Sequence, residues 1–583
     1  MLEAVVRLLV TVRSHRAIAV VLGLYALSAV VVPTLTPVAT TDDWAYARSV
    51  EILHDEHRLT IFPVVAATAV FQVVWGALFA ALLGGVTFGV VRLSTVAITA
   101  LGALALYGLC RQLNVDRHRS ALGTASYLFN PLSYVLSFSF MTDPHFAALL
   151  IVATACYVRG LTTESAEQAR SRRWTVLGSA AAGLAFLTRQ QGALIPLAVV
   201  IYLLSTRKLA PNRAGGALVL RVVALPAIAT VGYSLWLRYV NDVPTVQRSF
   251  LEEAVDAGWS GTGHLARYMT FFGMMYAGFF AVPLTAGALF GLRRLTRAVA
   301  HPGWLLFCAW EAILVAGLVF YGHAGRRMPY LPQFAGSSGL GPPDVLGGRP
   351  RLLELGVRDW LTAACAVSAV VLGLLVARNV RPPRRSRPAS TVDAGSRAKA
   401  GLVLTIGLWQ AIGVLPPSYH YIGWAGSLDR YLLPLLPFVV CLGFWAARDL
   451  RLAPPVAWVV VATFAVYSVA GTRDYLVYLN AVWGLAREAN AQGIDNTRLD
   501  AGSAWDGYHL YEHSLENKIR ARTPRGGPWW VYFYAPATDS SYVVAGRALD
   551  GYVIVNRRAY SSWLETEPTV IYLLRREGVA GPP

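Results

Sequence analysis

Charged residues are scarce in this sequence. Of its 583 residues, 14% are charged and 55% are hydrophobic, whereas a soluble domain carries about 25% charged residues. Many apolar runs approach the ~20 residues that a helix needs to cross a bilayer. These runs lack the polar–apolar alternation of a transmembrane β-barrel. The composition therefore predicts an α-helical polytopic membrane protein, because helices satisfy their own backbone hydrogen bonds within lipid.

Lysine is nearly absent and occurs only at Lys208, Lys399 and Lys518. The formal net charge of +18 therefore comes almost entirely from arginine. In a soluble protein this charge would suggest a nucleic-acid partner. Here the arginines cluster in short segments between apolar runs, which is typical of cytoplasmic loops that face anionic headgroups. We expect the partner of these charges to be the lipid bilayer, and we expect no nucleic acid.

Motifs for several other kinds of chemistry are also missing. The five cysteines lie in apolar runs at spacings that suit no metal site, and residues 472–583 contain none. The sequence has no Gly-rich phosphate loop, nucleophile elbow or HExxH zinc motif. No chain of intramembrane acids indicates an ion-coupled transporter. We predict no definite metal site or cofactor, and a divalent cation stays open.

The apolar runs predict 13 membrane spans. Their positions are 17–36, 88–110, 119–140, 144–161, 174–188, 190–206, 217–237, 268–292, 303–321, 358–378, 400–416, 431–448 and 454–471. The run Phe62–Gly85 is left out, because counting it would move the later arginine clusters to the outer side. We expect it to form a re-entrant or juxtamembrane helix pair. An odd number of spans, with the arginine clusters inside, predicts a plasma (inner) membrane protein with a cytoplasmic N-terminus. It also predicts a cytoplasmic linker at 379–399 and an extracytoplasmic C-terminal region.

The sequence predicts two domains. Residues 1–471 form a transmembrane domain whose first external loop covers 37–87. Residues 472–583 change character and predict a small extracytoplasmic α/β domain, which could bind an acceptor or serve as a structural cap. Its expected elements are a helix at Arg473–Gln492 and strands at Thr497–Asp500, Trp529–Tyr534, Gly551–Asn556 and Thr569–Leu574.

Two adjacent carboxylates, Asp42 and Asp43, follow the first apolar run and begin a short amphipathic segment. Both could simply cap a helix, with Thr41 or Asp42 accepting from free backbone amides. Alternatively, the two side chains point in different directions, so that one faces a cavity. A carboxylate that deprotonates a hydroxyl needs a raised pKa, which desolvation at a membrane surface can supply. We predict a catalytic base in this pair.

A third carboxylate, Asp143, lies in a minimal turn that the span parity places on the same outer face. Thr142 or Asp143 at the N-cap, with Pro144 at the first helical position, would be an ordinary helix start. The functional alternative is a carboxylate that binds the acceptor or orients the base. We expect the neighbouring His145 to contribute to the site without ligating a metal.

Several arginines on the predicted outer face oppose the usual charge bias. A guanidinium suits phosphate oxygens, so we predict that these side chains bind a lipid-linked phosphate, although snorkelling is the alternative for Arg189. The candidates are Arg189, Arg326, Arg327, Arg430 and Arg58. Aromatic and histidine side chains on the same face could stack on a sugar or form an interfacial belt. These are Tyr46, Tyr419, His420 and Trp424, together with His145.

The order of these pieces resembles the GT-C superfamily of glycosyltransferases, in particular bacterial members of family 39 related to protein O-mannosyltransferases and the lipid A aminoarabinose transferase. The resemblance rests on the segments 41–47 (TDDWAYA), 141–144 (MTDP), 187–189 (LTR) and 429–437 (DRYLLPLLP), and on the interfacial segment before 92–94 (RLS). It covers the chain from the first span to about residue 471.

The resemblance implies a polyprenyl-phosphate-linked sugar donor, an extracytoplasmic acceptor hydroxyl on a glycan, lipid or protein, and inversion in a single displacement. It also implies that Asp42 or Asp43 is the base, with a slight preference for Asp42, that Asp143 supports it and that Arg189 binds the phosphate. The family often has Asp-Glu instead of Asp-Asp. Its phosphate-binding Lys is missing here, so Arg58, Arg92 or Arg326 could substitute. The rival functions are a transporter or flippase for lipid-linked sugars and a GT-C-fold protein without catalysis.

Overall fold

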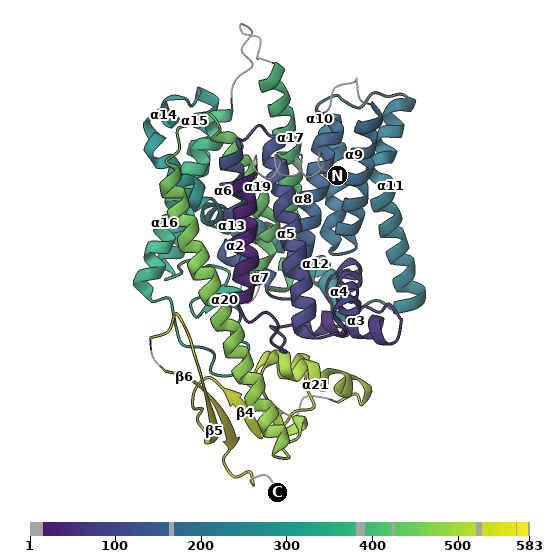
Figure 1. Cartoon of the computed structure of the whole chain (residues 1–583), viewed down its shortest axis with the longest axis vertical. Helices are drawn as coiled ribbons and strands as arrows, with labels where there is room; N and C mark the ends of the chain where they lie inside the picture. Colours follow the sequence, from purple (N-terminus) through teal and green to yellow (C-terminus); the bar gives the residue numbers. More distant parts are fainter. Residues whose placement is uncertain are drawn as a thin grey trace, which may run out of the picture.

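The computed structural model describes residues 15–162, 168–380, 391–421, 426–519, 527–566 and 568–580. It consists of a helical bundle with a small mixed domain at one end, which we call the site end (Figure 1). The main helices of the bundle are α2 (Arg16–Val31), α5 (Phe88–Gln112), α6 (Arg117–Leu128), α7 (Pro131–Ser137), α8 (Thr142–Leu161), α9 (Gln168–Phe186), α10 (Leu194–Ser205), α11 (Arg213–Trp236), α13 (Gly258–Ala288), α15 (His301–His323), α16 (Leu355–Asn379), α17 (Thr391–Ile412), α19 (Leu436–Ala446) and α20 (Pro454–Ala491).

The bundle confirms the predicted α-helical, polytopic fold class. Within the described ranges, nine helices are long and apolar enough to cross a membrane. Helices that are shorter or less apolar occupy the remaining predicted spans. The span predicted at 119–140 is divided, because Pro131 starts a new helix and the Asn130 side chain caps it by accepting from the Leu132 amide at 3.1 Å. The number of 13 spans stays a prediction.

The first external loop contains two helices at the site end, α3 (Asp43–Asp55) and α4 (Val70–Leu83). Residues 62–85 therefore hold one helix and not the expected pair. With 14 residues, α4 is about 21 Å long and shorter than the ~30 Å apolar layer. The segment before it is tied to the end of α9, since Ala69 donates to the Thr188 carbonyl at 3.1 Å.

The span predicted at 454–471 and the helix predicted at Arg473–Gln492 are both helical, and they belong to the same helix. The structure has one helix of 38 residues, α20, which leaves the bundle and enters the small domain (Figure 1). Its Asp474 carboxylate accepts backbone N–H groups of Trp563 and Leu564 at 2.8 to 2.9 Å. The helix thereby attaches the sheet of the domain to the bundle.

The small domain has a four-stranded sheet of order β3-β4-β6-β5, in which β3 and β4 are parallel and the other pairs are antiparallel. Its elements are β3 (Leu499–Asp500), α21 (Ser503–Glu516), α22 (Trp529–Phe533), β4 (Tyr542–Ala545), β5 (Tyr552–Tyr560) and β6 (Thr569–Arg576). The prediction of a small C-terminal α/β region is confirmed.

The strand predicted at Trp529–Tyr534 is wrong, because this segment forms the short helix α22. The aromatic run suggested a strand, but Trp530 and Tyr534 are both buried and lie four residues apart, as helical packing requires. The Trp530 indole also donates to Asp500 at 3.0 Å, which fixes the helix on the sheet.

The domain also packs on the first external loop. Trp44 of α3 makes ring contacts with Tyr511 and Tyr534, at centroid distances of 5.8 and 5.4 Å. A side chain at Gly507 of α21 would clash, since its Cβ would lie 2.5 Å from the Trp44 ring. Arg48 adds an ion pair with Glu512 at 3.0 Å. The start of α3 is therefore held between the bundle and the domain.

Candidate functional site

A cavity of about 1250 Å³ lies at the site end, where the bundle meets the small domain. Its lining comes from the start of α3, residues 64–67, Thr142, residues 189–194, the helix α12 (Thr245–Asp256), the loop 332–344, residues 413–421 and 428–431, and α22 with Tyr534. The polar residues among them are Thr41, Asp42, Tyr46, Thr142, Arg189, Gln190, Gln191, Gln247, Gln333, Ser337, Ser338, Asp344, His420, Tyr421, Arg430, Tyr431, Tyr532 and Tyr534.

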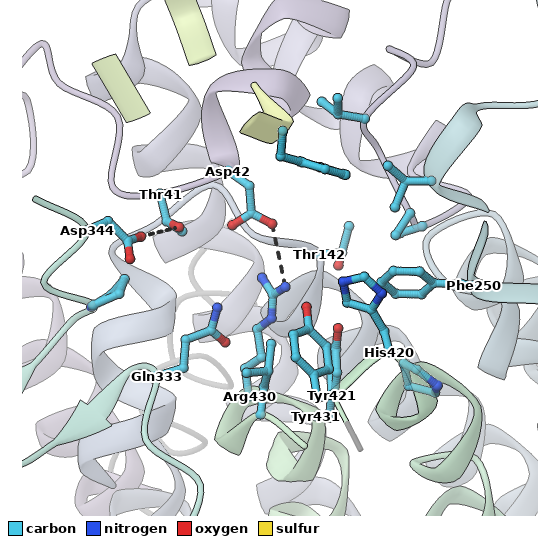
Figure 2. A pocket seen from close by; sticks show the side chains of 18 of the residues that line it. Thr41, Asp42, Thr142, Phe250, Gln333, Asp344, His420, Tyr421, Arg430 and Tyr431 are labelled. Atoms are coloured by element: carbon cyan, nitrogen blue, oxygen red, sulfur yellow. Dashed lines mark hydrogen bonds and ion pairs between the residues drawn. The ribbon is translucent and has the colours of Figure 1, made fainter. Parts of the chain in front are cut away.

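Asp42 directs its carboxylate into this cavity (Figure 2). It precedes the first residue of α3 but makes no side-chain capping hydrogen bond. Its Oδ2 lies 3.5 Å from a guanidinium nitrogen of Arg430, and its side chain keeps 26% exposure. The Asp42 carboxylate therefore does not cap the helix and is accessible to a ligand in the cavity.

Asp43 has a different environment and does not line the cavity. Its carboxylate accepts hydrogen bonds from the Thr40 amide at 2.7 Å, the Thr40 hydroxyl at 2.6 Å and the Phe140 amide at 3.1 Å. Burial raises the pKa of Asp43 above its ordinary value, although these hydrogen bonds and Arg92 oppose the shift. Asp43 therefore joins the first loop to the 138–141 turn.

Two arginines face the cavity, and both were predicted from the sequence. Arg430 pairs with Asp42, and Arg189 pairs with the buried carboxylate of Asp143. The ring of Tyr431 lies between them, with the guanidinium carbons 5.2 Å (Arg189) and 5.3 Å (Arg430) from its centroid. Both arginine side chains are only 9% exposed. The arrangement places two fixed positive charges on one wall.

Asp143 lies behind Arg189 and not in the cavity lining. Neither Thr142 nor Asp143 caps α8, because the N-cap residue is Met141 and makes no side-chain hydrogen bond. One carboxylate oxygen of Asp143 binds Arg189, and the other is buried without a hydrogen-bond partner. The geometry suits a residue that orients Arg189.

Asp344 lines the cavity and was missed by the sequence reasoning. Its Oδ2 accepts from the Thr41 hydroxyl at 2.9 Å, next to Asp42 (Figure 2). Withdrawal from water raises the pKa of Asp344 to about 6, and the nearby charge of Asp42 adds to this shift. A possible signal was the Gly-Pro-Pro-Asp stretch at 341–344, in a loop predicted to lie outside.

The loop that carries Asp344 is held by Asp429. This buried carboxylate accepts three backbone N–H groups, from Gln333 at 3.4 Å, Phe334 at 3.1 Å and Ala335 at 2.6 Å. Beyond them, a two-residue hairpin pairs β1 (Ala335–Gly336) with β2 (Gly339–Leu340). Asp429 thus holds this loop, while its sequence neighbour Arg430 pairs with Asp42.

The aromatic predictions separate into two groups. Tyr46 and His420 line the cavity, and His420 stacks on Phe250 at 4.8 Å and contacts Glu253 at 2.8 Å. Burial and the charge of Asp42 raise the pKa of Tyr46, so its hydroxyl stays a hydrogen-bond donor. Tyr419 instead contacts the Thr262 hydroxyl at 2.7 Å.

Several other predicted residues are not brought to the cavity. Arg58 is exposed and pairs with Glu56, while Arg327 pairs with Asp359. Arg326 contacts the Tyr268 hydroxyl at 2.6 Å within an aromatic cluster. The Arg92 guanidinium donates to the backbone carbonyls of residues 34, 36 and 38. His145 contacts the Met141 carbonyl. Trp424 lies outside the described residues.

Within the ranges that the structure describes, no three His, Cys, Asp or Glu side chains gather closely enough to hold a metal ion. The acids of the cavity, Asp42 and Asp344, lie next to each other without a third ligand of these types. The positive charges opposite them favour an anion on that wall.

Comparison with known proteins gives a family and a set of similar structures. Residues 63–233 match the sequence profile of the dolichyl-phosphate-mannose-protein mannosyltransferase family. A search of curated proteins gave no significant match. The structure is similar to ArnT from Cupriavidus metallidurans bound to undecaprenyl phosphate, with 17% identity, a TM-score of 0.45 and coverage of 96% of this chain and 99% of that chain.

A second similar structure is the archaeal oligosaccharyltransferase AglB from Archaeoglobus fulgidus, in complex with an inhibitory peptide and a dolichol-phosphate. It has 13% identity and a TM-score of 0.31, and the match covers 69% of this chain and 56% of that chain. The family match includes α4, α8 and Arg189, which are parts of the chain that carried the predicted resemblance. Within residues 63–233, the family match bears out the predicted resemblance to GT-C glycosyltransferases.

Proposed function

We propose that this protein transfers a sugar from a polyprenyl-phosphate donor to the hydroxyl group of an extracytoplasmic acceptor, with Asp42 as the catalytic base. The observation that carries the proposal is the opposition of Asp42 and Arg430 within one cavity, 3.5 Å apart. The matched family is named for a dolichyl-phosphate-linked mannose donor, which supports a donor of this kind.

The arginine wall suits the phosphate of the donor. Arg430 and Arg189 are both fixed by packing against Tyr431, so they need little reorganisation to meet an anion. The Arg430–Asp42 contact is long for an ion pair, whereas a phosphate offers oxygen atoms in the fork geometry that a guanidinium prefers. The incoming phosphate would therefore take Arg430 from Asp42 and leave the carboxylate free.

The apolar part of the cavity suits the start of the polyprenyl chain. α12 contributes Val246, Phe250, Leu251 and Ala254 to the lining, and Leu194 of α10 lies in the same cavity. Leu251 is also 68% exposed, so this side of the cavity opens toward the surroundings. In a membrane, an apolar chain could leave the site here without burying a charged group.

The reaction is then a single displacement. The acceptor oxygen forms a bond to the anomeric carbon while the bond between that carbon and the phosphate oxygen breaks, and its electron pair stays on the phosphate. The proton of the acceptor hydroxyl moves to Asp42. The products are the glycosylated acceptor and the polyprenyl phosphate, whose charge Arg430 and Arg189 stabilise. The site end would face the outside of a plasma membrane, with the N-terminus in the cytoplasm.

The test is sugar transfer by purified protein in liposomes that contain a polyprenyl-phosphate sugar. Asp42→Asn is expected to lower the transfer rate by about 10²- to 10⁴-fold, the usual contribution of a general base. The thermal unfolding temperature should stay close to the wild-type value, because the Asp42 side chain makes no helix-capping hydrogen bond. A wild-type transfer rate in Asp42→Asn would contradict the assignment of Asp42 as the base. Movement of the lipid-linked sugar across the bilayer by the wild-type protein, without sugar transfer, would favour the rival function of a transporter.

A further inference from the structure

Helix α22 supplies an aromatic wall to the cavity. Trp529, Tyr532 and Phe533 line the cavity and are 48%, 46% and 45% exposed. Their neighbours Trp530 and Tyr534 are buried and anchor the helix on Asp500 and Trp44. The small domain thus holds three aromatic faces open to the cavity, where burial by a ligand would be favourable.

The polar side chains beside this wall are mostly neutral groups that can form hydrogen bonds. The loop 332–344 contributes Gln333, Ser337, Ser338 and Asp344 to the lining. The Oε1 atom of Gln333 is buried without a hydrogen-bond partner, and both Gln333 and Asp344 face the cavity (Figure 2). An acceptor atom of this kind is costly unless a ligand donates to it.

The two sides of the cavity differ in charge. Among the described lining residues, the arginines are Arg189 and Arg430, and neither belongs to α22 or to the loop 332–344. The α22 side carries one carboxylate and no lysine or arginine. A ligand there would be a hydrogen-bond donor without negative charge, because an anion would lie against the carboxylates of Asp344 and Asp42, and Arg430 is already paired with Asp42.

We infer that α22 and the loop 332–344 form a binding site for a neutral saccharide, which is the acceptor of the transfer. A sugar ring combines an apolar C–H face with hydroxyl groups at its edge, and the wall offers aromatic faces beside the oxygen atoms of Gln333 and Asp344. Only the role of this saccharide as the acceptor rests on the proposed function. Binding of the saccharide is a property of this wall and can be measured without turnover.

The experiment uses the full chain in detergent micelles and a set of neutral oligosaccharides (manno-, galacto-, arabino- and gluco-). Saturation-transfer NMR reports which sugar protons contact the protein. We expect at least one of the four to bind through its C–H face, and we expect Trp529→Ala to weaken its affinity about 10- to 100-fold, the range for loss of one buried aromatic contact. Trp529→Phe should restore most of the affinity, because it keeps an aromatic face.

The matched control is Trp259→Ala, since Trp259 is 93% exposed and lies outside the cavity lining. It should bind the saccharide like the wild type. Failure of all four sugars to bind, or equal binding by Trp529→Ala, would overturn the inference. Binding of a peptide or an anionic lipid at this wall in place of the sugars would overturn it too.

Hydrolysis of the polyprenyl-phosphate sugar by water, measured without acceptor, separates this inference from the proposed function. Asp42-dependent hydrolysis in a protein that binds no saccharide would leave the proposed function standing and remove the saccharide site. Saccharide binding that depends on Trp529, in a protein that never cleaves the donor, would keep the site and remove the transferase.

Discussion

The carboxylate of Asp42 lies 3.5 Å from the guanidinium of Arg430, and both residues line the cavity. The proposed base and the proposed phosphate ligand thus form an ion pair in this structure. Because Arg430 is 9% exposed and Asp42 is 26% exposed, the pair is only partly shielded from water. The donor phosphate can replace Asp42 with limited loss of electrostatic energy.

Removing the charge of Arg430 should weaken binding of the donor. For Arg430→Gln we expect the KM for the polyprenyl-phosphate sugar to rise about 10- to 100-fold, since a charge-assisted hydrogen bond contributes about 1.5–3 kcal/mol. Steady-state kinetics over a range of donor concentrations measures this. Arg58→Gln is the control, because Arg58 is exposed and outside the cavity lining, and its KM should match the wild type. An unchanged KM for Arg430→Gln would exclude Arg430 as the phosphate ligand.

The Asp143–Arg189 ion pair should show strong coupling. Arg189→Met leaves a carboxylate of 0% exposure without its charged partner, so we expect a loss of about 3–5 kcal/mol in unfolding free energy. Adding Asp143→Asn to that variant removes the buried charge and should recover part of the loss. Chemical unfolding of the two single variants and the double variant gives the coupling energy. Additive losses would mean that the two groups do not interact.

Asp344 should make stability depend on pH. Burial raises the pKa of Asp344 from its ordinary value of 3.8 to about 6, so the folded state binds a proton more tightly than the unfolded state. This contribution to stability is fully present below about pH 4 and is lost as the pH rises through about 6.

Asp344→Asn mimics the protonated form, so this variant should be more stable than the wild type at pH 7.5 and similar to it at pH 4. Thermal unfolding in detergent at both pH values compares them. An equal difference in unfolding temperature at the two pH values would show that Asp344 has an ordinary pKa.

Asp429→Ala should destabilise the loop 332–344. Three backbone N–H groups lose their acceptor, and each buried donor left unsatisfied costs about 1–3 kcal/mol. We expect a lower unfolding temperature and faster proteolysis within this loop. Asp449→Ala is the control, since Asp449 is 63% exposed and makes ion pairs of 3.9 and 4.0 Å. Equal effects of the two substitutions would contradict the assignment to Asp429.

The sequence alone was enough to predict the helical membrane fold, because long apolar runs have few alternatives in lipid. It also predicted that Asp42, Arg189 and Arg430, from three distant segments, lie at one end of the bundle, since charge bias ordered the spans. It could not separate Asp42 from Asp43, because their difference depends on the 138–141 turn that occupies Asp43.

The sequence could not predict the positions of Asp344 and α22 in the cavity, because these positions also depend on tertiary contacts. Asp344 enters the cavity because Asp429, distant in sequence, folds the loop 332–344 toward Thr41. α22 enters it because Trp530 and Tyr534 dock on Asp500 and Trp44. The local pattern at 529–534 is that of a strand, and tertiary packing overrode it.

The continuous helix α20 fixes the height of the small domain above the bundle. Its 38 residues correspond to about 57 Å, of which a bilayer's apolar layer takes ~30 Å. A straight helix transmits displacement along its axis, so one added turn would move the attached sheet by about 5.4 Å. The length of α20 therefore sets how far the small domain lies from the apolar layer, and with it the position of the acceptor site that we infer on α22.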